Sequence, residues 1–182
     1  MMDIIEDKLT ILFIEGGLKL NRNIKQLDFY HITNATYLLI PLRHEKKLHT
    51  VVYDKTGILH VTQSPMKIIR ASCRQMGSSY QSALDISKQY FGEKKHKLPI
   101  VVAMDYGNPC IMFPLMSPKS PYNCWVSFNS LINIQDRAGQ INVTFKNHTE
   151  ADLDIQYASF CKQYVSSAML HKYLTSKWTR HF

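Results

Sequence analysis

Hydrophobic and polar positions follow a helical period between residues 64 and 80. If each residue turns a helix by about 100°, one arc collects the apolar side chains of this segment. These are Met66, Ile68, Ile69, Cys73 and Met76. Ser64 suits the cap before a helix, Pro65 its first position, and Gly77 the left-handed residue after its end. The pattern predicts a helix of about three turns with one face on a core.

Short segments rich in β-branched and aromatic residues predict strands on both sides of this helix. Residues 49–61 have the pattern of a hairpin, in which Val51 and Tyr53 face Ile58 and His60 across a turn at residues 54–57. Further strands are expected at residues 8–15, 36–40, 98–104, 110–115, 125–128 and 141–146. These strands predict a mostly antiparallel sheet.

Two more helices are predicted, at residues 81–91 and 159–178. On the second, Phe160 lies on one apolar face, whereas Leu170 and Leu174 lie on another. Either a partner subunit covers one face, or the domain itself wraps the helix. We therefore predict an α+β fold with a short central basic helix and a C-terminal helix, in a single domain over residues 1–182.

The positive charge is concentrated in the middle third of the chain. The net charge is +8, and residues 43–97 hold 11 basic and 4 acidic side chains. The helix predicted within residues 64–80 contains no acidic residue and places Lys67, Arg70 and Arg74 on a separate arc. Such an arc is either a solvated face or a site for a polyanion. Because the excess is local, it favours the polyanion, with nucleic acid as the leading class.

Other residues could join this cationic arc. They are Arg43, Lys46 and Lys47 in a basic turn and Lys94, Lys95 and Lys97 in a charged loop. The junction after the helix suits hydrogen bonds to phosphate, because it offers the hydroxyls of Ser78 and Ser79 and free N–H groups. Tyr80 could stack on a base or simply pack within the protein. The alternative for this junction is a helix C-cap followed by a short connection.

Signatures of the common enzyme classes are absent from the sequence. It has no Gly-rich phosphate loop, no G-x-S-x-G, no H-E-x-x-H and no closely paired carboxylates. We predict that the protein is not an enzyme, with Cys124 or Ser78 as a nucleophile kept as the alternative.

The four cysteines lack metal-type spacing. We therefore expect their thiols to be reduced and the protein to hold no metal or cofactor. The acidic N-terminus and short apolar runs predict a cytoplasmic protein that does not span a membrane, and binding to nucleic acid would associate it with the nucleoid.

Several short motifs resemble, in order and spacing, the competence transcription factor family, ComK. They are ASCRQMGSSY (71–80), KLPI (97–100), IMFP (111–114), SP (117–118), CWVS (124–127), VTFKN (143–147) and YASF (157–160). The segment SCRxxGSSY is the most specific of them. One departure is Gln81, Ser82 and Ala83, where members of the family often have a Gly-Arg pair, so a phosphate contact could move to Lys88, Lys94 or Lys95.

The resemblance implies a bacterial activator of genes for DNA uptake that binds paired A/T-rich boxes in double-stranded DNA through the minor groove. It also implies a homodimer or tetramer on DNA, with RNA polymerase and a proteolytic adaptor as further partners. The DNA-binding residues predicted on this basis are Lys67, Arg70, Arg74, Ser78, Ser79, Tyr80, Lys94, Lys95 and Lys97. The alternative function is a non-specific or single-stranded nucleic-acid-binding protein without an activator role.

Overall fold

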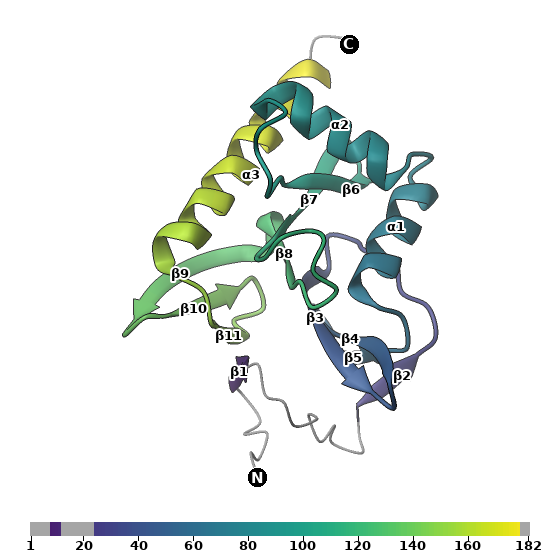
Figure 1. The fold of residues 1–182 in the computed structure, drawn as a ribbon, viewed down its shortest axis with the longest axis vertical. Helices are drawn as coiled ribbons and strands as arrows, with labels where there is room; N and C mark the ends of the chain where they lie inside the picture. The colour runs from purple at the N-terminus through teal and green to yellow at the C-terminus, as the bar shows by residue number, and fades with distance from the viewer. Residues whose placement is uncertain (1–7, 12–23, 179–182) are drawn as a thin grey trace.

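The computed structural model describes residues 8–11 and 24–178 and arranges them as two β-sheets and three α-helices (Figure 1). The helices are α1 (Pro65–Gln75), α2 (Tyr80–Phe91) and α3 (Tyr157–Trp178), and a single 3-10 turn spans Phe128–Ser130. The strands are β1 (Lys8–Ile11), β2 (Lys25–Leu27), β3 (Thr36–His44), β4 (Lys47–Asp54), β5 (Gly57–Val61), β6 (Ile100–Asp105), β7 (Asn108–Pro114), β8 (Trp125–Ser127), β9 (Leu131–Arg137), β10 (Gln140–Phe145) and β11 (Glu150–Leu153). The predicted α+β class, mostly antiparallel, is confirmed.

The larger sheet has seven strands in the order β2-β5-β4-β3-β8-β7-β6. Its strands pair antiparallel except β2 with β5. Strands β4 and β5 form the predicted hairpin, because Val51 pairs with His60 and Tyr53 with Ile58. Strand β3 continues past Pro41, which remains compatible with the sheet because β8 pairs with β3 only at Leu38 and Leu39.

The smaller sheet has four strands in the order β1-β11-β10-β9. The strand predicted at residues 141–146 is β10, and β1 covers the start of the strand predicted at residues 8–15, of which residues 12–15 lie outside the described chain. Strands β9 and β11 were not predicted. Strand β9 is an edge strand with mostly exposed residues, so its sequence lacks the alternation that marks a half-buried strand.

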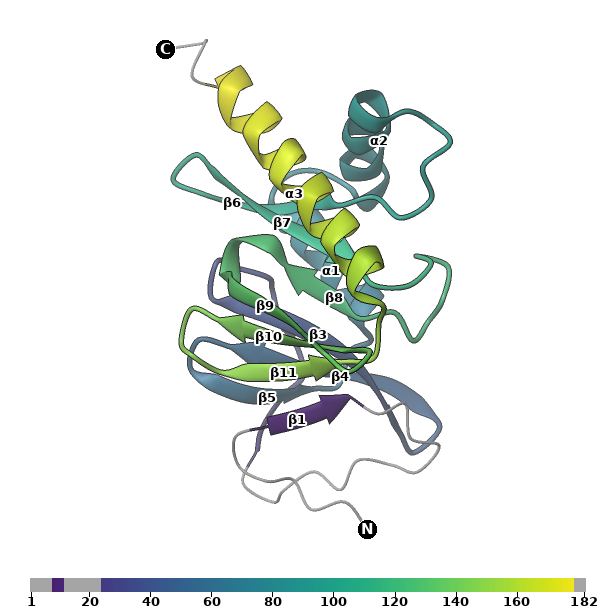
Figure 2. The ribbon, with the colours of Figure 1, turned by 90° about the vertical axis from the view of Figure 1, so that its left-hand side faces the viewer.

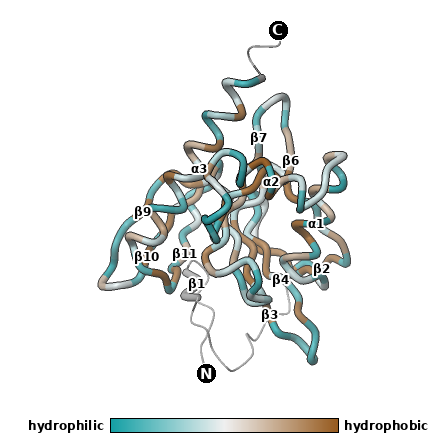
Figure 3. Tube along the Cα trace, turned by 45° about the horizontal axis from the view of Figure 1, so that its top comes forward, coloured by the Kyte–Doolittle hydropathy of each residue, from teal (hydrophilic) through white to brown (hydrophobic). Residues whose placement is uncertain are grey.

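The larger sheet lies between two layers. Helices α1 and α2 cover one face and the smaller sheet covers the other (Figures 1 and 2). Alternation along β3 supplies both cores: Leu38 and Ile40 face the smaller sheet, whereas Leu39 faces α1. Hydrophobic segments therefore concentrate in the middle strands, while the tip of the β3–β4 hairpin is hydrophilic (Figure 3).

Helix α3 packs against its own chain at Phe160 and again at Leu170 and Leu174, whereas Val165 between them is 53% exposed. Its Phe160 ring meets Phe113 edge-on at 5.4 Å. Further along, Leu170 and Leu174 are buried in a separate cluster with residues of β6 and β7. Of the two interpretations left open by the sequence, packing within the domain therefore accounts for the Leu170 and Leu174 face, and no partner subunit is needed to cover it.

Candidate nucleic-acid interface

Local sequence signals position helix α1. The hydroxyl of Ser64 accepts a hydrogen bond from the backbone N–H of Lys67 at 3.4 Å, and Pro65 is the first helical residue. After the helix, Gly77 has φ +78°, and its N–H donates to the carbonyl of Arg74 at 2.9 Å. A positive φ suits glycine because it has no Cβ. Both predicted ends of the helix are confirmed.

The outer face of α1 carries three exposed cations. Lys67, Arg70 and Arg74 point away from a face on which Ile68 and Ile69 are fully buried against the larger sheet. Within the described chain, none of the three forms an ion pair with a carboxylate. The helix has no acidic residue in its first turn, and Arg74 lies in its last turn. These cations are therefore held on a rigid element and remain available to an external anion.

The junction between α1 and α2 has a structural role of its own. The hydroxyl of Ser79 caps α2, because it accepts a hydrogen bond from the N–H of Ser82 at 3.0 Å and lies 2.8 Å from the Ser82 hydroxyl. Tyr80 is half-buried against the core beneath α1. Burial raises its pKa, which the neighbouring Arg70 guanidinium partly offsets. Ser79 thus caps the start of α2 and Tyr80 packs against the core, while a contact of either residue with DNA stays a prediction.

The three lysines before β6 differ in their surroundings. The ammonium of Lys95 donates to the Ser166 hydroxyl of α3 at 2.7 Å and lies 4.1 Å from the centre of the Phe91 ring. Lys97 donates to the carbonyl of Leu115 at 3.1 Å. Burial and the neighbouring Lys162 lower the pKa of Lys95. These two lysines tie the loop to α3 and to the end of β7.

Two further lysines bear on the predicted phosphate contacts. Lys94 is exposed and makes no ion pair among the described residues. Lys88, in the last turn of α2, pairs with Glu93 at 3.1 Å. Of the two, Lys94 is the better placed to meet an external phosphate.

Strand directions gather basic segments at one end of the larger sheet, which we call the basic end. There β3 turns into β4, β5 leads into α1, β7 leads into the loop before β8, and β6 begins (Figure 2). The basic residues of these segments are Arg43, Lys46, Lys47, Lys67, Lys94, Lys95, Lys97 and Lys119. Their acidic neighbours among the described residues are Glu45, Glu93 and Asp28, whose carboxylate lies 3.4 Å from the Thr62 hydroxyl. Lys67 lies at this end, whereas Arg70 and Arg74 follow α1 away from it.

Three histidines gather beneath the tip of the β3–β4 hairpin. His49 and His60 are buried, with Nδ1 of His49 2.9 Å from Nε2 of His60. The ring of the exposed His44 lies 5.2 Å from that of His49 and 5.8 Å from that of His60. We call these three residues the histidine cluster. The sequence analysis did not bring them together, although the predicted pairing of Val51 with His60 already placed His49 diagonally across the same face.

The buried cysteines of the described chain have raised pKa values. Burial raises the pKa of the Cys124 thiol to about 12, so its thiolate is scarce at neutral pH. The same cause raises the pKa of Cys110 to about 12 and of Cys73 to about 11. No group of three or more His, Cys, Asp or Glu residues within residues 8–11 and 24–178 could hold a metal ion, the histidine cluster included.

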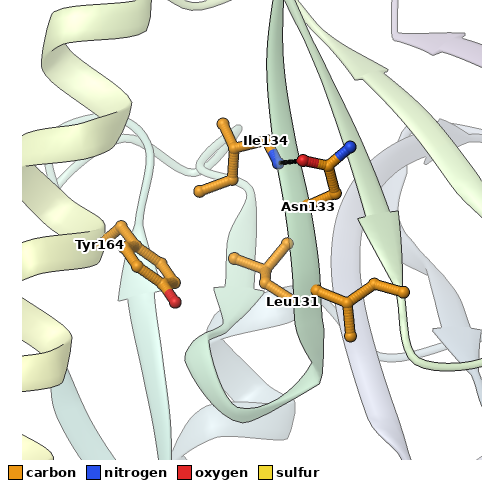
Figure 4. A pocket seen from close by; sticks show the side chains of 5 residues that line it. Leu131, Asn133, Ile134 and Tyr164 are labelled. Carbon is orange, nitrogen blue, oxygen red and sulfur yellow. Dashed lines mark hydrogen bonds between the residues drawn. The ribbon is translucent and has the colours of Figure 1, made fainter.

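A small open hollow of about 140 Å³ lies between β9 and α3 (Figure 4). It is lined by Leu131, Ile132, Asn133, Ile134 and Tyr164. The side chain of Asn133 accepts a hydrogen bond from the N–H of Ile134 at 3.0 Å. None of these residues is charged, so the hollow lacks the groups that bind a polyanion and stands apart from the cationic surface.

The fold and its exposed cationic helix define the class of this protein. It is a mostly antiparallel α+β protein that displays a basic helix over its larger sheet. The family model of the ComK protein matches residues 27–179. The chain therefore belongs to the ComK family, and the resemblance predicted from its motifs is confirmed. It is also 29% identical over 145 residues to a competence transcription factor of Bacillus subtilis (strain 168), a match covering 79% of this chain and 74% of that protein.

No solved structure matches this chain significantly. None of the helices in the described residues combines the length and the apolar character that crossing a bilayer requires.

Proposed function

We propose that this protein is a DNA-binding transcriptional activator of competence genes that prefers A/T-rich duplexes and reads them through the minor groove. Membership in the ComK family and the similarity to a competence transcription factor support a role in transcription. The chain would act as one DNA-binding domain, without enzymatic activity and without a cofactor. A homodimer or tetramer on DNA, and contacts with RNA polymerase and a proteolytic adaptor, belong to the same proposal.

The observation that carries the proposal is the outer face of α1. Three long cationic side chains stand in one row on a helix whose opposite face is fixed in the core. Like charges held close together on one helix face repel one another, and duplex phosphates relieve this repulsion while the DNA releases its condensed counterions. Lys67, Arg70 and Arg74 are therefore the principal contacts, with Ser78 and Lys94 as secondary ones.

The groove preference rests on the chemistry of A/T-rich DNA. Its minor groove is narrow and strongly electronegative, so inserted Arg and Lys side chains recognise its shape rather than base edges. The outer face of α1 offers guanidinium and ammonium groups and no acceptor-rich Asn or Asp in that row. In the major groove Arg and Lys contact chiefly guanine, which an A/T-rich box lacks, so these groups suit the minor groove of such a box.

The test is a titration by fluorescence anisotropy with three probes of equal length: a duplex with paired A/T-rich boxes, a mixed-sequence duplex and a single strand. We expect the tightest binding to the A/T-rich duplex. This preference should be lost when a ligand such as netropsin occupies the minor groove of that duplex. Equal affinity for all three probes would establish the alternative, a non-specific binder. Methyl green, which occupies the major groove, is the matched control.

Arg74 offers a sharper test within the site. Arg74→Ala should weaken binding by roughly 1–3 kcal/mol if this residue enters the groove, or lower the salt slope by about one if it contacts a phosphate. Lys146→Gln, which removes an exposed cation after β10 on the smaller sheet, is the matched control. Wild-type affinity for Arg74→Ala at two salt concentrations would remove Arg74 from the site.

A further inference from the structure

The tip of the β3–β4 hairpin projects beyond the strands on both sides of it. Strand β5 pairs with β4 only as far as Thr50, and β8 pairs with β3 only at Leu38 and Leu39. From Leu42 to His49 the two strands therefore pair only with each other. Residues 45 and 46 close the tip as a two-residue turn in the left-handed region. The hairpin ends as a narrow two-stranded projection.

This projection carries cations on both faces. Arg43 shares the α1 side of the sheet with Leu39, because side chains alternate along β3. Lys47 pairs with His44 and lies on the opposite side, and Lys46 stands at the apex. All three cations are exposed, and within the described chain none forms an ion pair. Because Lys67 begins α1 at the same end of the sheet, the hairpin extends the cationic surface beyond that helix.

The histidine cluster supplies charge that depends on protons at the base of this projection. His44 comes from β3, His49 from β4 and His60 from β5, all on the face opposite to α1. The groups that act on them are one another, Lys47 and Glu45, while the uncharged Gln26 of β2 pairs with His60. Each proton bound by the cluster adds a positive charge beside Lys47.

We propose that the tip of the β3–β4 hairpin is a second contact for duplex phosphates, and that proton uptake by His49 and His60 at its base strengthens this contact. The inference rests on the proposed DNA-binding function and adds to it a second site with its own regulation. Arg43, Lys46 and Lys47 make the contact, and the histidine cluster sets how much charge stands behind them.

The sign of the pH effect follows from the surroundings of the histidines. Burial lowers the pKa of His49 and His60, and neighbouring positive charges lower it further. Both histidines are therefore mainly neutral at pH 7. A bound phosphate opposes that lowering, because it favours the imidazolium. DNA binding therefore takes up protons, and by linkage the affinity rises as the pH falls.

The hairpin charges are tested with a triple variant, Arg43→Gln, Lys46→Gln and Lys47→Gln, against the A/T-rich duplex. We expect about tenfold to a hundredfold weaker binding and a salt slope lower by about two to three. Glu45→Asn is the matched control. It removes the one acidic residue of the tip, so it should tighten binding, and asparagine tolerates the left-handed backbone at this position. Unchanged affinity and slope in the triple variant would overturn the second contact.

Proton linkage is tested on the wild-type protein, so that no buried histidine is altered. Calorimetric titration of the duplex in two buffers of different ionisation enthalpy should show net proton uptake on binding below pH 7, and affinity should rise as the pH falls, by about tenfold per pH unit for each proton taken up. His44→Gln, an exposed position, should reduce both effects, whereas His148→Gln on the turn before β11 should leave them unchanged. The absence of proton uptake would overturn the linkage. It would also be overturned if His44→Gln left the uptake unchanged and imidazole NMR signals showed that histidines outside the cluster take up the proton.

The two proposals fail in different ways. A wild-type protein that binds no duplex at any pH contradicts both. Binding to the A/T-rich duplex that depends on α1, but is unchanged in the triple hairpin variant and involves no proton uptake or release, has a different meaning. This result is consistent with the proposed function and contradicts the second contact at the hairpin.

Discussion

Two groups of cations that look alike in the sequence differ in what their charges do. On α1, Lys67, Arg70 and Arg74 are exposed and make no ion pair with the described part of the chain. In the loop before β6, Lys95 and Lys97 donate hydrogen bonds to Ser166 and to the Leu115 carbonyl. The first group is free to meet an external anion, whereas the second stabilises the fold.

The difference lies in the supporting element. A helix fixes its outer side chains by burying the opposite face, so the cations of α1 need no further contacts to hold their positions. An irregular loop has no such face, and Lys95 and Lys97 place their ammonium groups on nearby acceptors instead. Charge density along the sequence is therefore a weaker guide to binding than the element that carries it.

The strongest test of this comparison removes the charges of α1 together. Lys67→Gln, Arg70→Gln and Arg74→Gln in one protein should weaken binding to the A/T-rich duplex by about 3–4 kcal/mol, because each lost cation gives up a phosphate or groove contact. The salt slope should fall by about three. Urea unfolding should be nearly unchanged, and a comparable loss of stability would show that these residues also hold the fold.

Lys97→Met tests the other side of the comparison. The substitution keeps the apolar stem and deletes the ammonium that bonds the Leu115 carbonyl, so the free energy of unfolding should fall by about 1–2 kcal/mol. DNA affinity of the folded protein should stay within about twofold of the wild type. Urea denaturation and anisotropy on the same sample separate the two effects, and the reverse pattern would move Lys97 to the binding surface.

Ser79→Ala asks whether the junction after α1 caps a helix or contacts DNA. Loss of the hydroxyl that accepts from the Ser82 N–H should cost about 1 kcal/mol of stability. Ser78→Ala is the matched neighbour, because its hydroxyl does not cap α2. We expect Ser79→Ala to change the unfolding midpoint and Ser78→Ala to change DNA affinity, and a result in the opposite sense would exchange their roles.

Lys94→Gln is the smallest and most discriminating change, since Lys94 belongs to the loop but is exposed like the cations of α1. Stability should not change measurably. The salt slope of DNA binding should fall by one or less, because a single exposed cation accounts for at most about one phosphate contact. A stability loss like that of Lys97→Met would place Lys94 with the structural lysines.

Much of the fold follows from local patterns. The register of β4 and β5 and the two ends of α1 depend on residues close together in sequence, and each was predicted. Strands β9 and β11 were missed because a short or exposed strand gives little periodic signal. The α1 cations were also found from spacing alone, since they share one helix.

The sequence by itself determined the basic helix, its buried face and the family to which the chain belongs. Tertiary structure alone decided that Lys95 and Lys97 are engaged, because their partners lie 71 and 18 residues away. It also brought His44, His49 and His60 together from three strands. Local periodicity records only which face a residue occupies, whereas contacts between distant segments depend on how strands pair and layers pack.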